Sequence, residues 1–116
     1  MATPLDTLID DMLLAMSDED KERFKKERED MPGVSFHFSL GMAMRNELGL
    51  WRNDTPLTCW FQEHNILHGD DRSATIYKAL YCRLHGRPFD IDAEELQHTN
   101  FWRGRGLKND GSPIDI

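Results

Sequence analysis

Two polar residues of one expected helix have the types and spacing of a chemical site. His37 and Arg45 lie eight residues apart with Gly41 midway, so on a helix all three share one face. The histidine could act as a general base beside the cation, and Asp70 and Asp71 could add carboxylates. The alternative is structural, since Arg45 could pair with one of these aspartates and lock two helices together.

Neither interpretation identifies an enzyme. The chain contains no G-x-S-x-G nucleophile motif and no GxxxxGK[ST] phosphate loop. We therefore assign no catalytic residue and no cofactor, and we keep a small-ligand-binding or hydrolytic protein as an alternative function. The residues that would form either the polar lock or the ligand pocket are His37, Arg45, Asn46, Asp70, Asp71 and Ser73.

A second pair of histidines has the spacing of metal ligands. His64 and His68 are four residues apart, which places two such ligands on one face of a helix. Asn65 and Gly69 indicate that the helix ends between them, so we expect His68 to lie in the turn that caps the next helix. The sequence thus predicts helix capping here and no metal site.

Acidic residues are concentrated in the first third of the chain. The sequence has 21 acidic and 14 basic residues and a formal net charge of −7, of which residues 1–32 carry −5. This charge disfavours binding to phosphate backbones. The charges could belong to a solvated helix face or dock on a basic partner protein. The expected acidic interaction surface consists of Asp6, Asp10, Asp11, Asp18, Glu19, Asp20 and Glu22.

The C-terminal residues carry a net positive charge, in contrast to the acidic first third of the chain. From residue 99 onward the net charge is +1, and Trp102, Arg103 and Arg105 lie among glycines. An aromatic residue among arginines can stack on single-stranded nucleic acid, so a nucleic-acid accessory protein is a second alternative. Docking of this tail on the acidic body of the protein, or on a partner, is the interpretation that we favour.

The elements that must position these residues are helices. Hydrophobic residues recur at helical spacing, Thr3-Pro4, Ser17 and Thr55-Pro56 are start signals, and Gly49 and Gly86 are stop signals. We expect an all-α protein, a compact bundle of four to five short helices with an irregular C-terminal tail. The helical segments are expected over residues 3–16, 17–29, 34–51, 56–65, 71–85 and 93–97.

The length of 116 residues is that of one domain. We expect a single helical domain over residues 1–97 and a tail over residues 98–116 that packs on the domain or on a partner. Cys59 and Cys82 form no CxxC pair, and we expect both to be buried, reduced thiols. The predicted core comprises Leu8, Met12, Phe36, Leu40, Met44, Leu48, Trp51, Trp60, Phe61, Ile76, Leu80 and Leu84.

A set of short motifs also follows the pattern of a known family. These motifs are MSDEDKERF at 16–24, HFSLG at 37–41, RN at 45–46, GLW at 49–51, DDRS at 70–73, Ile76, Leu84 and HGRPFDID at 85–92. Over about residues 5–92 the chain resembles a small bacterial and phage family, domain of unknown function 6794. The resemblance implies one folded unit and a bacterial or phage setting, and it implies no activity.

Together these observations predict a protein-interaction module. No apolar run approaches the roughly 20 residues of a membrane span, and no secretion signal is evident, so we expect a cytoplasmic protein, in the host cell if it is phage-encoded. The predicted partner is a protein with a basic surface. An inhibitor or immunity protein in bacterial or phage conflict is the setting that the resemblance implies.

Overall fold

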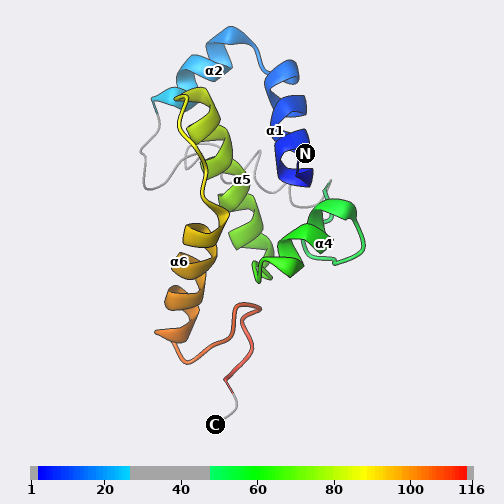
Figure 1. Ribbon diagram of the computed structural model, residues 1–116, viewed down its shortest axis with the longest axis vertical. Coiled ribbons are helices and arrows are strands. Elements are labelled where there is room, and N and C mark those ends of the chain that lie inside the picture. Colours follow the sequence, from blue (N-terminus) through cyan, green and yellow to red (C-terminus); the bar gives the residue numbers. More distant parts are fainter. Residues whose placement is uncertain (1–2, 27–47, 115–116) are drawn as a thin grey trace.

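The computed structural model of this chain describes residues 3–26 and 48–114. In chain order they form α1 (Pro4–Ala15), α2 (Asp18–Lys25), α4 (Pro56–Glu63), α5 (Gly69–Leu84) and α6 (Ile91–Arg103) (Figure 1). Within these ranges all regular structure is helical apart from one isolated bridge between Leu107 and Pro113. The all-α prediction is confirmed. Residues 27–47 lie outside the described ranges, and with them most of the helix expected over 34–51.

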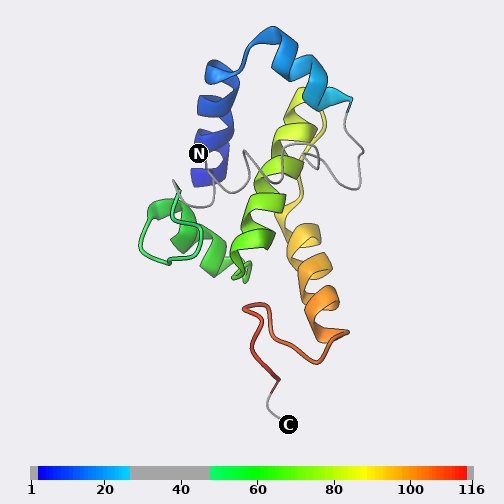
Figure 2. The same cartoon turned by 180° about the vertical axis from the view of Figure 1, so that it is seen from behind.

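Helix α5 is the central element of the described fold. Helix α1 packs against α4 and α5, and α2 packs against α5. Helix α6 lies along the lower half of α5, on the side away from α1, as the two opposite views show (Figures 1 and 2). Two separate surfaces of α5 are therefore covered by different parts of the chain.

Local capping signals define the starts of three helices. Thr3 Oγ1 accepts a hydrogen bond from the backbone N–H of Asp6 at 3.1 Å, and Ser17 Oγ accepts one from Asp20 at 3.1 Å. Thr55 caps α4 in the same way, with a proline at the first helical position. The predicted starts of α1, α2 and α4 are confirmed.

The last two helices differ from their predicted bounds. Helix α5 begins at Gly69, earlier than residue 71, because His68 caps it through a 3.2 Å hydrogen bond from the Asp70 N–H to His68 Nδ1. The short helix expected over 93–97 is wrong. Helix α6 begins at Ile91 because Asp90 caps it, and it continues to Arg103 because no glycine or proline interrupts it before Gly104. The expected domain boundary after residue 97 therefore falls inside a helix.

The hydrophobic core gathers around α5. Phe61, Ile76 and Leu80 of the predicted core are buried, and Leu8, Met12, Leu48, Trp60 and Leu84 are partly buried against it. Phe36, Leu40 and Met44 lie outside the described residues. The buried hydrophobic residues are Leu5, Ile9, Phe24, Leu50, Phe61, Ile66, Ile76, Tyr77, Ala79, Leu80 and Tyr81.

The predictions that Trp51 and Cys59 are buried are wrong. Trp51 is 55% exposed, and its indole lies across the start of α5, where a Cβ added to Gly69 would come within 2.7 Å of the ring. The glycine thus gives the indole a flat surface to cover. Cys59 is exposed, Cys82 is half-buried, and no disulfide joins them.

Candidate functional site

Two polar stripes face each other between α5 and α6. On α6, Glu94, His98 and Trp102 are spaced four residues apart, so their side chains share one face of the helix. On α5, Asp71 and Lys78 lie two turns apart on the facing surface, and they contact these α6 side chains. We call these five residues the polar clasp.

Each ionisable group of the polar clasp has a partner of opposite charge or a hydrogen-bond donor. Trp102 Nε1 donates to Asp71 Oδ2 at 2.7 Å, and His98 Nδ1 lies 3.4 Å from Asp71 Oδ1. His98 Nε2 lies 2.7 Å from Glu94 Oε1, and Lys78 Nζ donates to the same oxygen at 3.0 Å. The clasp is a continuous chain of contacts from one end of the interface to the other.

Burial and pairing act in opposite directions on Glu94. The residue is 5% exposed, and burial alone raises the pKa of its carboxyl group. The hydrogen bond from His98 and the charge of Lys78 outweigh burial and bring the pKa of Glu94 below its usual value. A charged Glu94 is therefore the form that the folded protein stabilises. The contacts of the clasp join α5 to α6.

A second buried polar group was missed by the sequence analysis. Arg72 is 1% exposed on α5, and its guanidinium donates to the carbonyl oxygens of Ile66, Leu50 and Arg52 at 2.8, 3.0 and 2.8 Å. It also donates to Asn53 Oδ1 at 2.7 Å. Burial lowers the pKa of Arg72, with a smaller opposing contribution from Cys59. Arg72 ties the segment before α4 to α5, which is the type of role proposed for Arg45.

Of the expected lock or pocket residues, the structure describes Asp70, Asp71 and Ser73, which all lie at the start of α5. Asp71 belongs to the polar clasp, Asp70 is exposed in the first turn of α5, and the buried Ser73 hydroxyl donates to the Asp70 carbonyl at 2.9 Å. His37, Arg45 and Asn46 lie outside the described residues. Within the described residues, Asp71 contacts α6, whereas the hydrogen bond from Ser73 to Asp70 stays inside α5.

The acidic surface divides into paired and unpaired carboxylates. Arg83 of α5 bridges Asp6, at 3.8 Å, and Asp10. Glu22 lies 3.5 Å from Lys25 on α2. For the remaining members, Asp11, Asp18, Glu19 and Asp20, the residues of ranges 3–26 and 48–114 supply no ion-pair partner, and all four are exposed.

The predicted tail residues also separate. Trp102 lies in α6 and belongs to the polar clasp, whereas Arg103 is exposed. Arg105 stacks on the Phe101 ring, with its guanidinium carbon 4.0 Å from the ring centroid. The segment after α6 returns to the fold through Asn109, whose Nδ2 donates to the Asn65 carbonyl at 2.8 Å and to Thr99 Oγ1 at 2.9 Å. Asn109 therefore ties the tail to the end of α4 and to α6.

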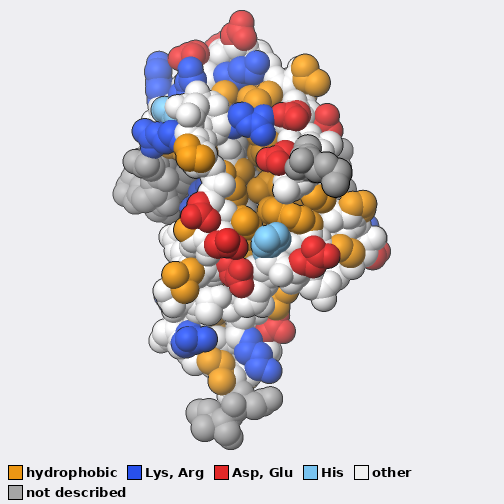
Figure 3. Space-filling view, viewed as in Figure 1, with side chains coloured by type: hydrophobic (Ala, Val, Ile, Leu, Met, Phe, Trp, Pro, Cys, Tyr) orange, Lys and Arg blue, Asp and Glu red, His pale blue; other side chains and the backbone are white. Residues whose placement is uncertain are grey.

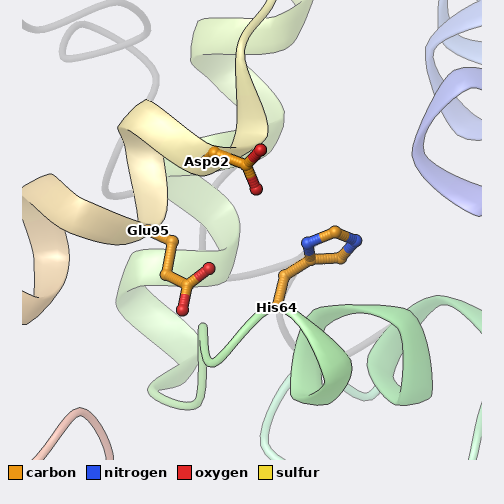
Figure 4. Close-up of side chains that lie close together, drawn as sticks. All are labelled: His64, Asp92 and Glu95. Atoms are coloured by element: carbon orange, nitrogen blue, oxygen red, sulfur yellow. The ribbon is translucent and has the colours of Figure 1, made fainter.

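The two histidines of the 64/68 pair have separate environments. His68 caps α5 and packs between Trp51 and Trp102, at ring-centroid distances of 5.0 and 5.3 Å. His64 ends α4 and faces Asp92 and Glu95 at the start of α6 (Figure 4). Sequence reasoning missed this set because its members come from two helices that are adjacent only in the fold.

None of the described helices has both the length and the hydrophobicity required to cross a lipid bilayer. The sequence model of the family described as "Domain of unknown function (DUF6794)" matches residues 4–84. This match spans α1, α2, α4 and α5 but ends before α6, so the HGRPFDID stretch at 85–92 lies beyond it. No curated protein and no solved structure matches the chain.

Proposed function

We propose that this chain, which belongs to the DUF6794 family, is a protein-interaction module that docks on a basic surface of a partner protein. The proposed docking surface lies where α1 ends and α2 begins. It consists of Leu14 and the four unpaired acids, Asp11, Asp18, Glu19 and Asp20, which we call the acidic corner.

The observation that supports this proposal is the exposure of Leu14. Its side chain is 87% exposed, the highest value among the large hydrophobic residues of the described segments. Asp11 lies three residues earlier on the same helix, and Asp18 begins the next helix. An exposed hydrophobic residue near charged groups suits a small docking site, because the apolar contact adds affinity and the charges add selectivity.

The corner acids make this surface negatively charged, because no described residue pairs with them. Arg83 partly neutralises Asp6 and Asp10. The negative charge of the corner acids, in contrast, is not compensated by any described residue. Figure 3 shows acidic side chains at the end of the molecule formed by α1 and α2, with lysine and arginine side chains beside them. An exposed charged surface of this type accelerates association with an oppositely charged partner and loses that effect as salt rises.

The alternatives have less support from the described contacts. Asp71, required for a ligand pocket or hydrolytic site, is already bound by Trp102. Trp102, required for nucleic-acid stacking, is bound by the same contact and is only half-exposed. We retain the cytoplasm as the proposed compartment, and an inhibitor or immunity protein as the proposed role.

The test compares two charge-reversed variants with the same change in net charge. Asp11→Lys with Glu19→Lys alters the acidic corner, and Asp54→Lys with Glu63→Lys alters exposed acids elsewhere. Affinity capture from bacterial lysate at low salt, followed by titration of the captured partner, should give a salt-sensitive complex that the first variant weakens and the second does not. Capture of no partner at micromolar protein, or equal affinity in both variants, would contradict the proposal.

A further inference from the structure

We infer that His64, Asp92 and Glu95 form a binding site for a divalent transition-metal ion of the Zn²⁺ class. The three residues come from two elements, since His64 ends α4 and the two acids lie in the first turns of α6. An ion bound there would join the end of α4 directly to the start of α6. The proposed site is separate from the acidic corner.

The geometry brings one ligand atom from each residue into a common space. A ring nitrogen of His64 and one carboxylate oxygen from each acid all lie within 4.8 Å of one another. Figure 4 shows both carboxylates and an edge of the imidazole ring turned toward the same gap between the helices. Metal bonds of about 2.0–2.2 Å require these atoms to approach to roughly 3.4 Å in a tetrahedral site. Side-chain rotation can supply this shift, because Asp92 is exposed and Glu95 is half-exposed.

The environment leaves the ligand atoms available. No side-chain hydrogen bond or ion pair joins His64, Asp92 or Glu95 to another described residue. Asp92 and Glu95 are three residues apart on one helix, where two negative charges repel each other. A cation between them would remove this repulsion. The Trp60 ring packs on His64 at a centroid distance of 4.6 Å, which restricts the orientation of the imidazole.

The donor set selects the type of ion. Mg²⁺ and Ca²⁺ prefer oxygen ligands, whereas an imidazole nitrogen favours Zn²⁺ and related transition metals. Three protein ligands leave at least one coordination position for water or for a donor from another molecule. Trp60, which packs on His64, also lines a groove of about 270 Å³ with Ile91, the residue before Asp92. Figure 3 shows a histidine at the lower edge of a hydrophobic hollow with acidic side chains nearby.

The experiment measures Zn²⁺ binding to the full chain, purified without a histidine tag and treated with a chelator. Calorimetric titration should give one saturable Zn²⁺ site, with much weaker binding of Mg²⁺. In thermal unfolding, Zn²⁺ at about 100 times its dissociation constant should raise the midpoint by roughly 10 °C, because the ion binds the folded chain. The absence of saturable Zn²⁺ binding would overturn the inference.

Matched variants assign the ligands. Asp92→Asn and Glu95→Gln keep the side-chain shape and should each weaken Zn²⁺ binding by about 10-fold or more. Glu63→Gln, an exposed residue next to His64, should bind as the unmodified chain does. The imidazole resonances of His64 should shift on Zn²⁺ addition. Since thiolates also bind Zn²⁺, Cys59→Ser with Cys82→Ser must retain the site. Loss of binding in this cysteine variant, or normal binding in both acid variants, would overturn the assignment.

Discussion

The polar contacts of α5 and the acidic corner both consist of charged side chains, but they differ in burial and in pairing. Arg72 and the clasp residues Glu94 and His98 are at least nine-tenths buried, and each has partners at hydrogen-bond distance. Asp18 and Glu19 of the corner are exposed and have no partner within the described segments. A buried charge is tolerated only when it is paired, whereas an exposed one remains available to other molecules. The comparison separates charges that hold the fold from charges that can act outside it.

The largest expected effect is on Arg72. Arg72→Met keeps much of the side-chain volume but leaves the carbonyls of Leu50, Arg52 and Ile66 without their donor. Because buried acceptors without partners are costly, we expect a loss of about 3 kcal/mol or more in the free energy of unfolding. Urea denaturation followed by circular dichroism measures it. A loss below about 1 kcal/mol would mean that water replaces these contacts.

The polar clasp should show the next largest effect. Glu94→Gln removes the charge that pairs with His98 and Lys78, and we expect a loss of about 1–3 kcal/mol near neutral pH. The folded protein lowers the pKa of Glu94, so its contribution to stability is complete above the usual carboxyl pKa of about 4.3 and is lost as pH falls through the lowered value. Denaturation of both proteins at several pH values measures the difference, which should shrink in acid. A difference independent of pH would contradict this account.

Trp102 should contribute less than Glu94. Trp102→Phe keeps the aromatic packing and removes the 2.7 Å hydrogen bond to Asp71. We expect a loss of about 1–2 kcal/mol, because the acceptor is charged but can be partly reached by water. A double-mutant cycle of Trp102→Phe and His98→Gln measures whether these two neighbours of Asp71 act together, which a non-additive change in the free energy of unfolding would reveal. Strict additivity would show that they act independently.

The acidic corner should show the smallest effect on stability. Asp11→Lys with Glu19→Lys changes two exposed residues without described ion-pair partners, and Glu19 also lies in the first turn of α2, where the helix dipole favours an acid, so we expect the free energy of unfolding to fall by no more than about 1 kcal/mol. Thermal unfolding of this variant beside the Asp54→Lys, Glu63→Lys control checks it. A marked destabilisation would mean that the corner acids support the fold, and it would remove the contrast between the two regions.

Local signals were sufficient to predict α1, α2 and α4. Thr3, Ser17 and Thr55 are capping residues that act over three positions of the chain, and their effect can be read without knowing the fold. Helix α6 was predicted too short because the residues that recur every four positions on its inner face, Glu94, His98 and Trp102, do not form a hydrophobic stripe. A search for hydrophobic periodicity does not detect a helix whose buried face is charged.

The site residues were harder to predict than the helices. Arg72 has a detectable signal, because it occupies the same helix face as Ile76 and Leu80, four and eight residues later, where a hydrophobic residue would be expected. The polar clasp has no such signal, since Asp71 and Trp102 are 31 residues apart and meet only through the packing of α5 on α6. The same holds for His64 and its two acidic neighbours.

The ion pair between Arg83 and Asp10 joins residues 73 positions apart in the chain. Leu5 and Ile9 of α1 are buried in the core around α5, so α1 reaches its final position only after α5 has formed. During synthesis, the α1–α2 segment leaves the ribosome well before α5 and has to wait for it with its hydrophobic face uncovered. The net negative charge of this segment opposes association between waiting chains through charge repulsion. Closure of this long loop is therefore expected to be a late step that limits the folding rate.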